Sequence, residues 1–290
     1  MHAVSTFFGA ALTLLTLSTA AAKVAYAETA TLDIRVEAGT WGNARPGDIE
    51  AVLYSVVDAL GPSFSRQGTK ISVAYSDDGP RVLLDRSADG SHRVFLKVRD
   101  ARWDQFTYQF SHELCHIFTN HEHREMAPGV ITRDHQWFEE TLCEAVSLYT
   151  LERMAVRWGQ APPHASWKSY APAFRDYAEQ LLAASHRRLT ANQTVAEWFA
   201  ANRQALAANP YARQRNELLA VQILTLLNAT PDGLQSIAYL NAEKGAVPPS
   251  FASYLEAWYA CCPDSHRRFI AEVMNLLQEG GGRRPNDLCG

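Results

Sequence analysis

Two segments of the chain carry apolar residues at helical spacing and contain neither proline nor glycine. In the first, residues 101–120, the apolar positions recur every three or four residues, at Trp103, Phe106, Phe110, Leu114 and Ile117. In the second, which begins at Trp137, they recur at Phe138, Leu142, Ala145 and Tyr149. A loop containing Pro128-Gly129 separates the two segments and is long enough to reverse the chain. The pattern therefore predicts two amphipathic helices, with the second crossing the first.

The segments on either side of these helices differ in pattern. Before residue 100, short runs predict strands over 32–36, 71–75, 81–84 and 93–98, with one helix over 46–60 that starts at a proline. After residue 150 the periodicity is almost entirely helical, over 171–184, 194–207, 211–228, 232–241 and 250–278. We therefore predict an α+β fold with a mixed lobe (28–155), a helical lobe (156–279) and a glycine-rich tail (280–290).

The N-terminus bears on where the chain works. The apolar run from Phe7 to Ala22 is about 16 residues long, which is short for a membrane span, and Ala25-Tyr26-Ala27 follows as a small-residue cleavage pattern. We expect residues 1–27 to be a signal peptide cleaved after Ala27, which leaves a periplasmic or secreted protein without a stable membrane span. An uncleaved anchor is the alternative, because no Lys or Arg precedes the apolar run. The formal net charge of −4 gives no reason to expect nucleic acid as a partner, and the oligomeric state stays open.

Candidate chemistry concentrates on the polar face of the first helix, in His112-Glu113-Leu114-Cys115-His116. Residues four apart on a helix lie one turn above each other, so both imidazoles project from one face. Two neutral imidazoles supply half of a tetrahedral zinc shell, and the adjacent Glu113 can take a proton from a water that zinc activates. Leu114 lies about 200° around the helix from His112, so this face is turned away from the apolar stripe. The motif predicts one Zn²⁺ ion, with Glu113 as the general base.

The second helix offers a third ligand. Glu140 and Glu144 share one face a turn apart, so one carboxylate can complete the metal shell while the other accepts the free N–H of a ligating imidazole. Glu139 is an alternative ligand, but its side chain points about 100° away from that face and no acidic residue lies four positions further on. A purely structural zinc site would normally close its shell with four protein ligands. Three ligands leave an open position, which favours catalysis over a structural role.

The two helices together resemble the gluzincin branch of the zinc metallopeptidases, which includes thermolysin-like and aminopeptidase-like proteins. H-E-x-x-H is followed about twenty residues later by W-x-x-E-x-x-x-E, with Thr141 where the family often has glycine, and the match covers about 35 residues. The resemblance implies a zincin-like fold in which an edge strand of the sheet holds extended substrate by backbone hydrogen bonds. It assigns roles to five residues: His112, His116 and Glu140 as zinc ligands, Glu113 as the base and Glu144 behind an imidazole.

Two functional classes agree with these residues. The first is an exported zinc metallopeptidase, or a closely similar amide hydrolase, acting on a peptide or protein substrate. The second is a catalytically inactive zincin-fold protein that binds a peptide or another protein. Glu113 favours catalysis, because a binding scaffold needs metal ligands but no general base. Zinc hydrolases of this kind usually add a Tyr or His donor for the oxyanion; Tyr211, after Asn209-Pro210, is the preferred candidate, and Tyr149 and His123 are alternatives.

The remaining cysteines and histidines leave alternatives open. Cys115 and Cys143 occupy equivalent offsets in the two motif helices, so they are either joined by a disulfide or packed as two small buried side chains. A second bridge could join Cys289 to Cys261 or Cys262. Three further histidines flank the motifs, but the charge-rich loop that holds them is more typical of a solvated rim than of a second metal site: His121, His123 and His135.

Overall fold

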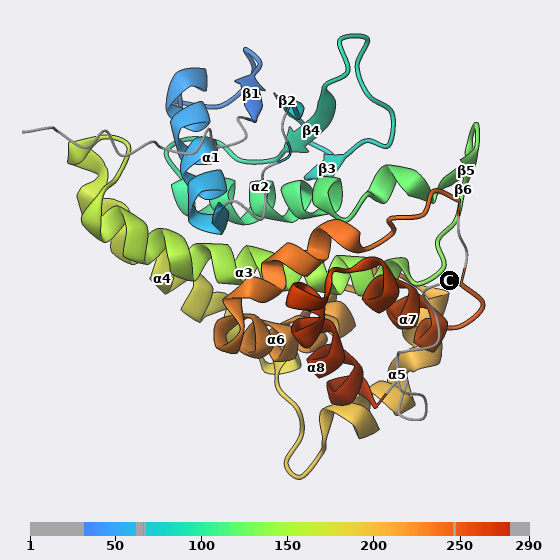
Figure 1. Cartoon of the computed structure of the whole chain (residues 1–290). Helices are drawn as coiled ribbons and strands as arrows, with labels where there is room; N and C mark the ends of the chain where they lie inside the picture. The colour runs from blue at the N-terminus through green and yellow to red at the C-terminus, as the bar shows by residue number, and fades with distance from the viewer. Residues whose placement is uncertain (1–31, 62–65, 67, 246–247, 279–290) are drawn as a thin grey trace, which may run out of the picture.

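Two long helices lie side by side at the centre of the molecule, α2 (Trp103–Phe118) and α3 (Gln136–Gln160) (Figure 1). The fold comes from a computed structural model that describes residues 32–61, 66, 68–245 and 248–278. A small mixed sheet lies over α2, and most of the remaining helices gather on the far side of α3 (Figure 1). The predicted α+β class is confirmed. The predicted signal peptide (1–27) and the tail (280–290) lie outside the described residues.

The sheet contains four strands in the order β1-β2-β4-β3. Strands β1 (Asp33–Val36), β2 (Lys70–Tyr75) and β4 (His92–Leu96) are parallel, and β3 (Arg81–Val82) runs antiparallel to β4 at the edge. Helix α1 (Pro46–Leu60) makes the crossover that a parallel β1–β2 pair requires. The predicted strands are therefore confirmed to within about two residues at each end. β4, which leads into α2, is an interior strand, and the edge strand beside it is β3.

The second half of the chain is helical, as the pattern predicts. Its elements are α4 (Ala171–Leu182), α5 (Val195–Ala208), α6 (Arg213–Ala229), the 3-10 helix Pro231–Tyr239, α7 (Phe251–Cys261) and α8 (Arg267–Leu277). The single helix predicted over 250–278 is wrong, because Pro263 disfavours helical backbone at Cys262 and separates α7 from α8. Residue 155, where the sequence pattern predicts the boundary between two lobes, lies inside α3.

The loop between α2 and α3 contains structure that the sequence pattern did not reveal. After a 3-10 turn (His121–Arg124), strands β5 (Glu125–Ala127) and β6 (Val130–Ile131) form a hairpin that turns at Gly129, where φ is 75°. The apolar side chains of this hairpin are about half exposed: Met126, Val130 and Ile131. Because the hairpin has no buried face, its strands lack the alternation by which strands are recognised in a sequence.

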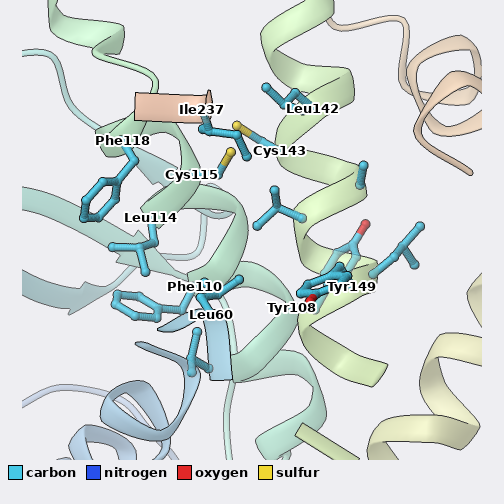
Figure 2. Close-up of a cluster of buried hydrophobic side chains, with 14 of the residues drawn as sticks. Leu60, Tyr108, Phe110, Leu114, Cys115, Phe118, Leu142, Cys143, Tyr149 and Ile237 are labelled. Carbon is cyan, nitrogen blue, oxygen red and sulfur yellow. The ribbon is translucent and has the colours of Figure 1, made fainter. Parts of the chain in front are cut away.

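Both apolar stripes of the motif helices are buried. Trp103, Phe106, Phe110, Leu114 and Ile117 of α2 are at most 5% exposed, as are Phe138, Leu142, Ala145 and Tyr149 of α3. Cys115 and Cys143 lie among them where the helices meet (Figure 2), and both are free thiols. Of the two alternatives for this pair, the structure contains the packed thiols, and burial and the neighbouring Cys115 raise the pKa of Cys143 well above its ordinary value.

Two further sequence predictions concern a second disulfide and the absence of a membrane span. Cys262 is a free thiol, and Cys289 lies outside the described residues, so the second bridge is not described. In the described part of the chain, no helix combines the length and the apolar character that a bilayer crossing requires.

Candidate metal centre

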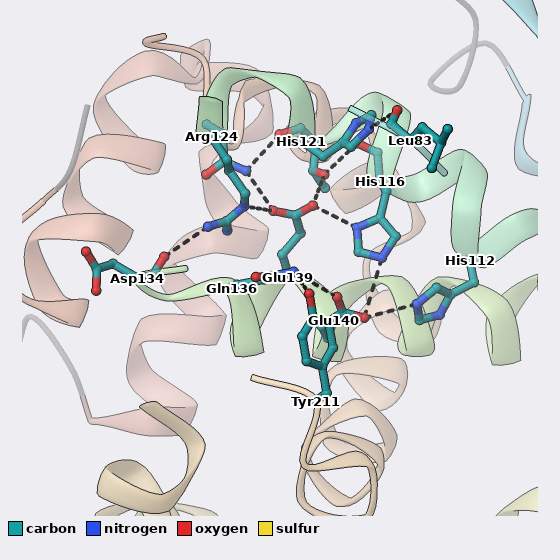
Figure 3. A network of polar contacts seen from close by, with 12 residues as sticks. Leu83, His112, His116, His121, Arg124, Asp134, Gln136, Glu139, Glu140 and Tyr211 are labelled. Atoms are coloured by element: carbon teal, nitrogen blue, oxygen red, sulfur yellow. Dashed lines mark hydrogen bonds and ion pairs between the residues drawn. The ribbon is translucent and has the colours of Figure 1, made fainter. Parts of the chain in front are cut away.

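The polar faces of α2 and α3 meet in an antiparallel register. Glu140 of α3 faces both His112 and His116 of α2, and Glu139, one position earlier, faces His116 (Figure 3). One turn further along α3, Glu144 faces Tyr108, which lies one turn back along α2. Helical periodicity places each side chain on its face, and the antiparallel packing then decides which partner it meets.

Three potential ligands converge at this crossing. The ligand atoms of His112, His116 and Glu140 all lie within 4.8 Å of one another, the one such group among the described residues. Glu140 Oε2 is 3.3 Å from His112 Nε2 and 3.5 Å from His116 Nε2. A tetrahedral zinc ion with bonds of about 2.0–2.1 Å requires ligand atoms about 3.3–3.4 Å apart. The two separations from Glu140 Oε2 match that requirement closely.

Glu139 determines which ring nitrogen of a neutral His116 carries the proton. Glu139 Oε1 lies 2.7 Å from His116 Nδ1, so the carboxylate takes the Nδ1–H of the ring. A neutral His116 then turns the lone pair of its Nε2 towards Glu140 Oε2, and two acceptors face each other at 3.5 Å. Either a proton on Nε2 or a cation between the two atoms must relieve this contact. Burial disfavours the proton, but Glu140 and Glu139 outweigh burial and raise the pKa of His116 well above its ordinary value.

Glu139 is itself held by groups from three segments. Arg124 Nε donates to Glu139 Oε2 at 2.6 Å, Thr119 Oγ1 donates to Oε1 at 3.0 Å, and Asn241 Nδ2 donates to Oε2 at 3.0 Å. Burial alone would raise the pKa of this carboxyl, but Arg124 and His116 lower it to about 2. Glu139 is therefore an ionised, fully enclosed anchor for the imidazole. Sequence reasoning considered Glu139 only as an alternative ligand and missed this role.

Glu113 sits beside the metal group with its carboxyl group buried. It is 4% exposed, and burial raises the pKa of its carboxyl group above the ordinary value. The backbone of Val82, in edge strand β3, hydrogen-bonds this carboxylate and partly opposes the rise. Glu113 thus stands between the candidate ligands and the exposed edge of the sheet.

A cleft of about 450 Å³ opens onto these residues. Strand β3 lines one side of it with Arg81 and Val82, while Ile131 of the hairpin and Tyr211, before α6, line other parts. Gln136 Nε2 donates to Tyr211 Oη at 2.9 Å and approaches Glu140 Oε1 at 3.4 Å, which brings Tyr211 to the metal group (Figure 3).

The two alternatives to Tyr211 lie elsewhere. Tyr149 is 5% exposed and packs in the core (Figure 2), and the ring of His123 contacts the carbonyl of Asn241 at 2.9 Å. Neither lines the cleft. Among the three tyrosine and histidine candidates, the structure therefore brings only Tyr211 to the site.

The expected role of Glu144 behind an imidazole is not borne out by its contacts. Its Oε2 accepts the hydroxyl of Tyr108 at 2.5 Å and its Oε1 accepts Arg187 Nη2 at 2.7 Å. Because the helices are antiparallel, one more turn along α3 carries this carboxylate past His112 to Tyr108. Glu144 lines the cleft but contacts neither candidate histidine ligand among the described hydrogen bonds. The carboxylate that holds an imidazole is Glu139.

The other histidines do not assemble a second metal group in the described residues. His121, His123 and His135 each direct a ring nitrogen to a backbone carbonyl, those of Leu83, Asn241 and Pro248. His121 is 6% exposed, so the loop is less solvated than its charge suggests. Each ring carries an N–H to a carbonyl and serves to fix the loop.

Comparison with known proteins gives no assignment: no protein-family model matches the chain, and a search of curated proteins finds no significant match. The candidate site therefore rests on its own geometry.

Proposed function

We propose that the protein is an exported zinc-dependent metallopeptidase with a zincin-like fold. The main support for the proposal is the approach of His116 Nε2 to within 3.5 Å of Glu140 Oε2, on a ring that Glu139 orients through Nδ1. With His112 this pair offers a donor set of two imidazoles and one carboxylate, the set typical of catalytic zinc sites that keep an open position. Zinc bound there would supply a Lewis acid and lower the pKa of water to about 7.

Glu113 is the general base in this proposal. Its carboxylate accepts a proton from the attacking water and returns it to the amine nitrogen as the amide bond breaks. A raised pKa suits this task, because a base works best when its pKa approaches the operating pH. Burial also keeps bulk water from competing for the proton.

Tyr211 is the proposed donor to the oxyanion. Its hydroxyl oxygen accepts a hydrogen bond from Gln136, and no described contact uses its own O–H, which stays available for a substrate oxygen. The preceding turn is fixed by Asn216, whose Nδ2 donates to the Pro210 carbonyl at 2.7 Å. In the described part of the chain, edge strand β3 has no strand on its outer side, which leaves room for an extended peptide to lie along it.

The test combines metal analysis with hydrolysis of a peptide library by wild type, Glu113→Gln and Glu140→Gln. We expect wild type and Glu113→Gln to bind one zinc ion per chain, and Glu140→Gln to bind it at least about tenfold more weakly. Cleavage should fall about a hundredfold or more in Glu113→Gln, because the base is lost while the ligands remain. If wild type and Glu113→Gln both bind zinc and neither cleaves any peptide, the protein is instead an inactive zincin-fold binding protein.

A further inference from the structure

The acidic and basic residues that line the cleft differ in how far they are exposed to solvent. Its carboxylates are mostly buried, and three of them are paired with arginines: Glu139 with Arg124, Glu144 with Arg187 and Glu217 with Arg213. The other two are Glu140, which belongs to the metal group, and Glu113, which lies beside it. At the mouth the exposed charged side chains are arginines, with side-chain exposures of 38% for Arg81 and 73% for Arg213, and Arg133 is also exposed.

Two of these arginines carry charge that no cleft carboxylate neutralises. The nearest described acid to Arg81 is Asp78, 3.8 Å away and itself 87% exposed, and Asp78 does not line the cleft. Among the described ion pairs none includes Arg133. An exposed ion pair of this length contributes little, so both guanidinium groups remain available to a ligand.

Both guanidinium groups are held against aromatic rings. Arg81 lies over the ring of Phe95, 4.5 Å from its centroid, and its Nη1 donates to Ser76 Oγ at 3.0 Å and to the Gly79 carbonyl at 3.2 Å. Arg133 lies over the ring of Tyr211, 5.8 Å from its centroid. Stacking on a ring face uses no N–H group, so the Nε and Nη2 groups of Arg81 and the guanidinium of Arg133 can donate to a carboxylate. Stacking also reduces the entropy that these groups lose on binding.

The two arginines are connected to the metal group through different residues. Arg133 reaches it through Tyr211, Gln136 and Glu140, whereas Arg81 is next to Val82, whose backbone contacts Glu113. When a peptide lies along β3 across Glu113, one acidic side chain would meet Arg81 and another would meet Arg133.

We propose that the cleft selects acidic peptides, with aspartate or glutamate side chains on both sides of the scissile bond received by Arg81 and Arg133. This inference rests on the proposed function for the position of the scissile bond. The recognition itself depends on charge at the mouth, so it can be measured without turnover.

The test measures binding of matched peptides to zinc-loaded Glu113→Gln by fluorescence anisotropy. The two peptides have blocked termini and differ only in carrying Glu or Gln on both sides of the same central dipeptide. We expect the Glu peptide to bind roughly tenfold more tightly at low salt, with each arginine contributing roughly threefold. The preference should shrink in 0.5 M salt, where the Debye length is only about 4 Å.

Arginine variants in the Glu113→Gln background locate the effect. Arg81→Gln and Arg133→Gln should each reduce the preference roughly threefold, whereas Arg175→Gln, an equal charge change at an exposed position of α4 away from the cleft, should preserve it. Equal affinity for the two peptides, binding of neither, or a preference that survives both cleft variants overturns the inference. Cleavage by the wild-type protein is scored separately: a Glu preference without cleavage rejects the peptidase and retains acidic-peptide recognition.

Discussion

Two buried ionic clusters each contain one glutamate of α3, and the clusters differ in what that glutamate contacts. The upper cluster joins Glu139 to Arg124, Thr119, Asn241 and His116. The lower cluster joins Glu144 and Glu217 to Arg187, with Tyr108, His186 and Arg213 around them.

The upper cluster touches a candidate metal ligand, and the lower cluster touches none. Both enclose an arginine that is at most 6% exposed, so both oppose a large desolvation cost. A buried ion pair near a metal group therefore does not necessarily orient a metal ligand. It does so only where one of its acceptor oxygens reaches an imidazole N–H.

Removing the charge of Glu139 should have the largest effect. Glu139→Gln leaves Arg124 buried without its counter-ion, which is expected to cost about 3 kcal/mol of unfolding free energy. It also weakens the acceptor that orients His116, which should lower zinc affinity about 10- to 100-fold. Chemical denaturation and zinc competition titrations measure the two effects separately. A variant with unchanged stability and unchanged zinc affinity would show that Glu139 neither supports Arg124 nor orients His116 for zinc.

Glu144→Gln is the matched change in the lower cluster. Arg187 keeps Glu217 at 3.2 Å, so the expected loss of unfolding free energy is smaller, about 2 kcal/mol. Zinc affinity should stay within about twofold of wild type, because no ligating ring contacts this residue. A drop in zinc affinity as large as that of Glu139→Gln would restore the role that the sequence pattern first suggested for Glu144.

The lower cluster should also make the stability of the protein depend on pH, through Glu217. Burial would raise the pKa of Glu217, but hydrogen bonds from Arg213 and His186 and the charge of Arg187 outweigh burial and lower it. A depressed folded-state pKa stabilises the protein above the unfolded value of about 4.3, and this contribution is lost as the pH falls through the folded value.

Glu217→Gln should therefore cost about 1 kcal/mol at pH 7, since Arg213 is largely exposed, and less as the pH falls below about 4.3. Urea denaturation of both proteins between pH 3 and pH 7 measures the difference. A cost that stays constant over this range would mean that Glu217 titrates alike in the folded and unfolded chains.

Tyr211→Phe should leave stability almost unchanged, because Tyr211 is 54% exposed and belongs to neither cluster. We expect turnover of a cleaved peptide to fall about tenfold with zinc content unaffected. Steady-state kinetics with metal analysis provide the check. Full turnover in Tyr211→Phe would leave the oxyanion donor to another group.

Helical periodicity was sufficient to place His112, His116 and Glu140, because each position depends mainly on which face of its own helix it occupies. It failed for Glu139 and Glu144, because their partners depend on the direction in which α3 passes α2. An antiparallel passage moves Glu144 towards Tyr108 and leaves Glu139 beside His116. The 100° that separates Glu139 from the ligand face is what lets it reach the far nitrogen of the ring.

The groups that complete the upper cluster come from segments with little periodic signal. Arg124 lies in a 3-10 turn before the hairpin, and Asn241 lies more than a hundred residues later with a left-handed φ of 51°. Neither position can be paired with Glu139 by sequence spacing, since tertiary packing alone brings them together. The arginines at the mouth likewise become a group only once β3 and Tyr211 face the same cleft.

The proposed metal centre is tested most directly by a crystal structure of the zinc-loaded protein with anomalous data on both sides of the zinc absorption edge. We expect one anomalous peak about 2.0–2.1 Å from His112 Nε2, His116 Nε2 and Glu140 Oε2, with His116 Nδ1 still hydrogen-bonded to Glu139. A peak ligated by other residues would rule out this centre, as would the absence of a peak while His112 and His116 remain hydrogen-bonded to Glu140.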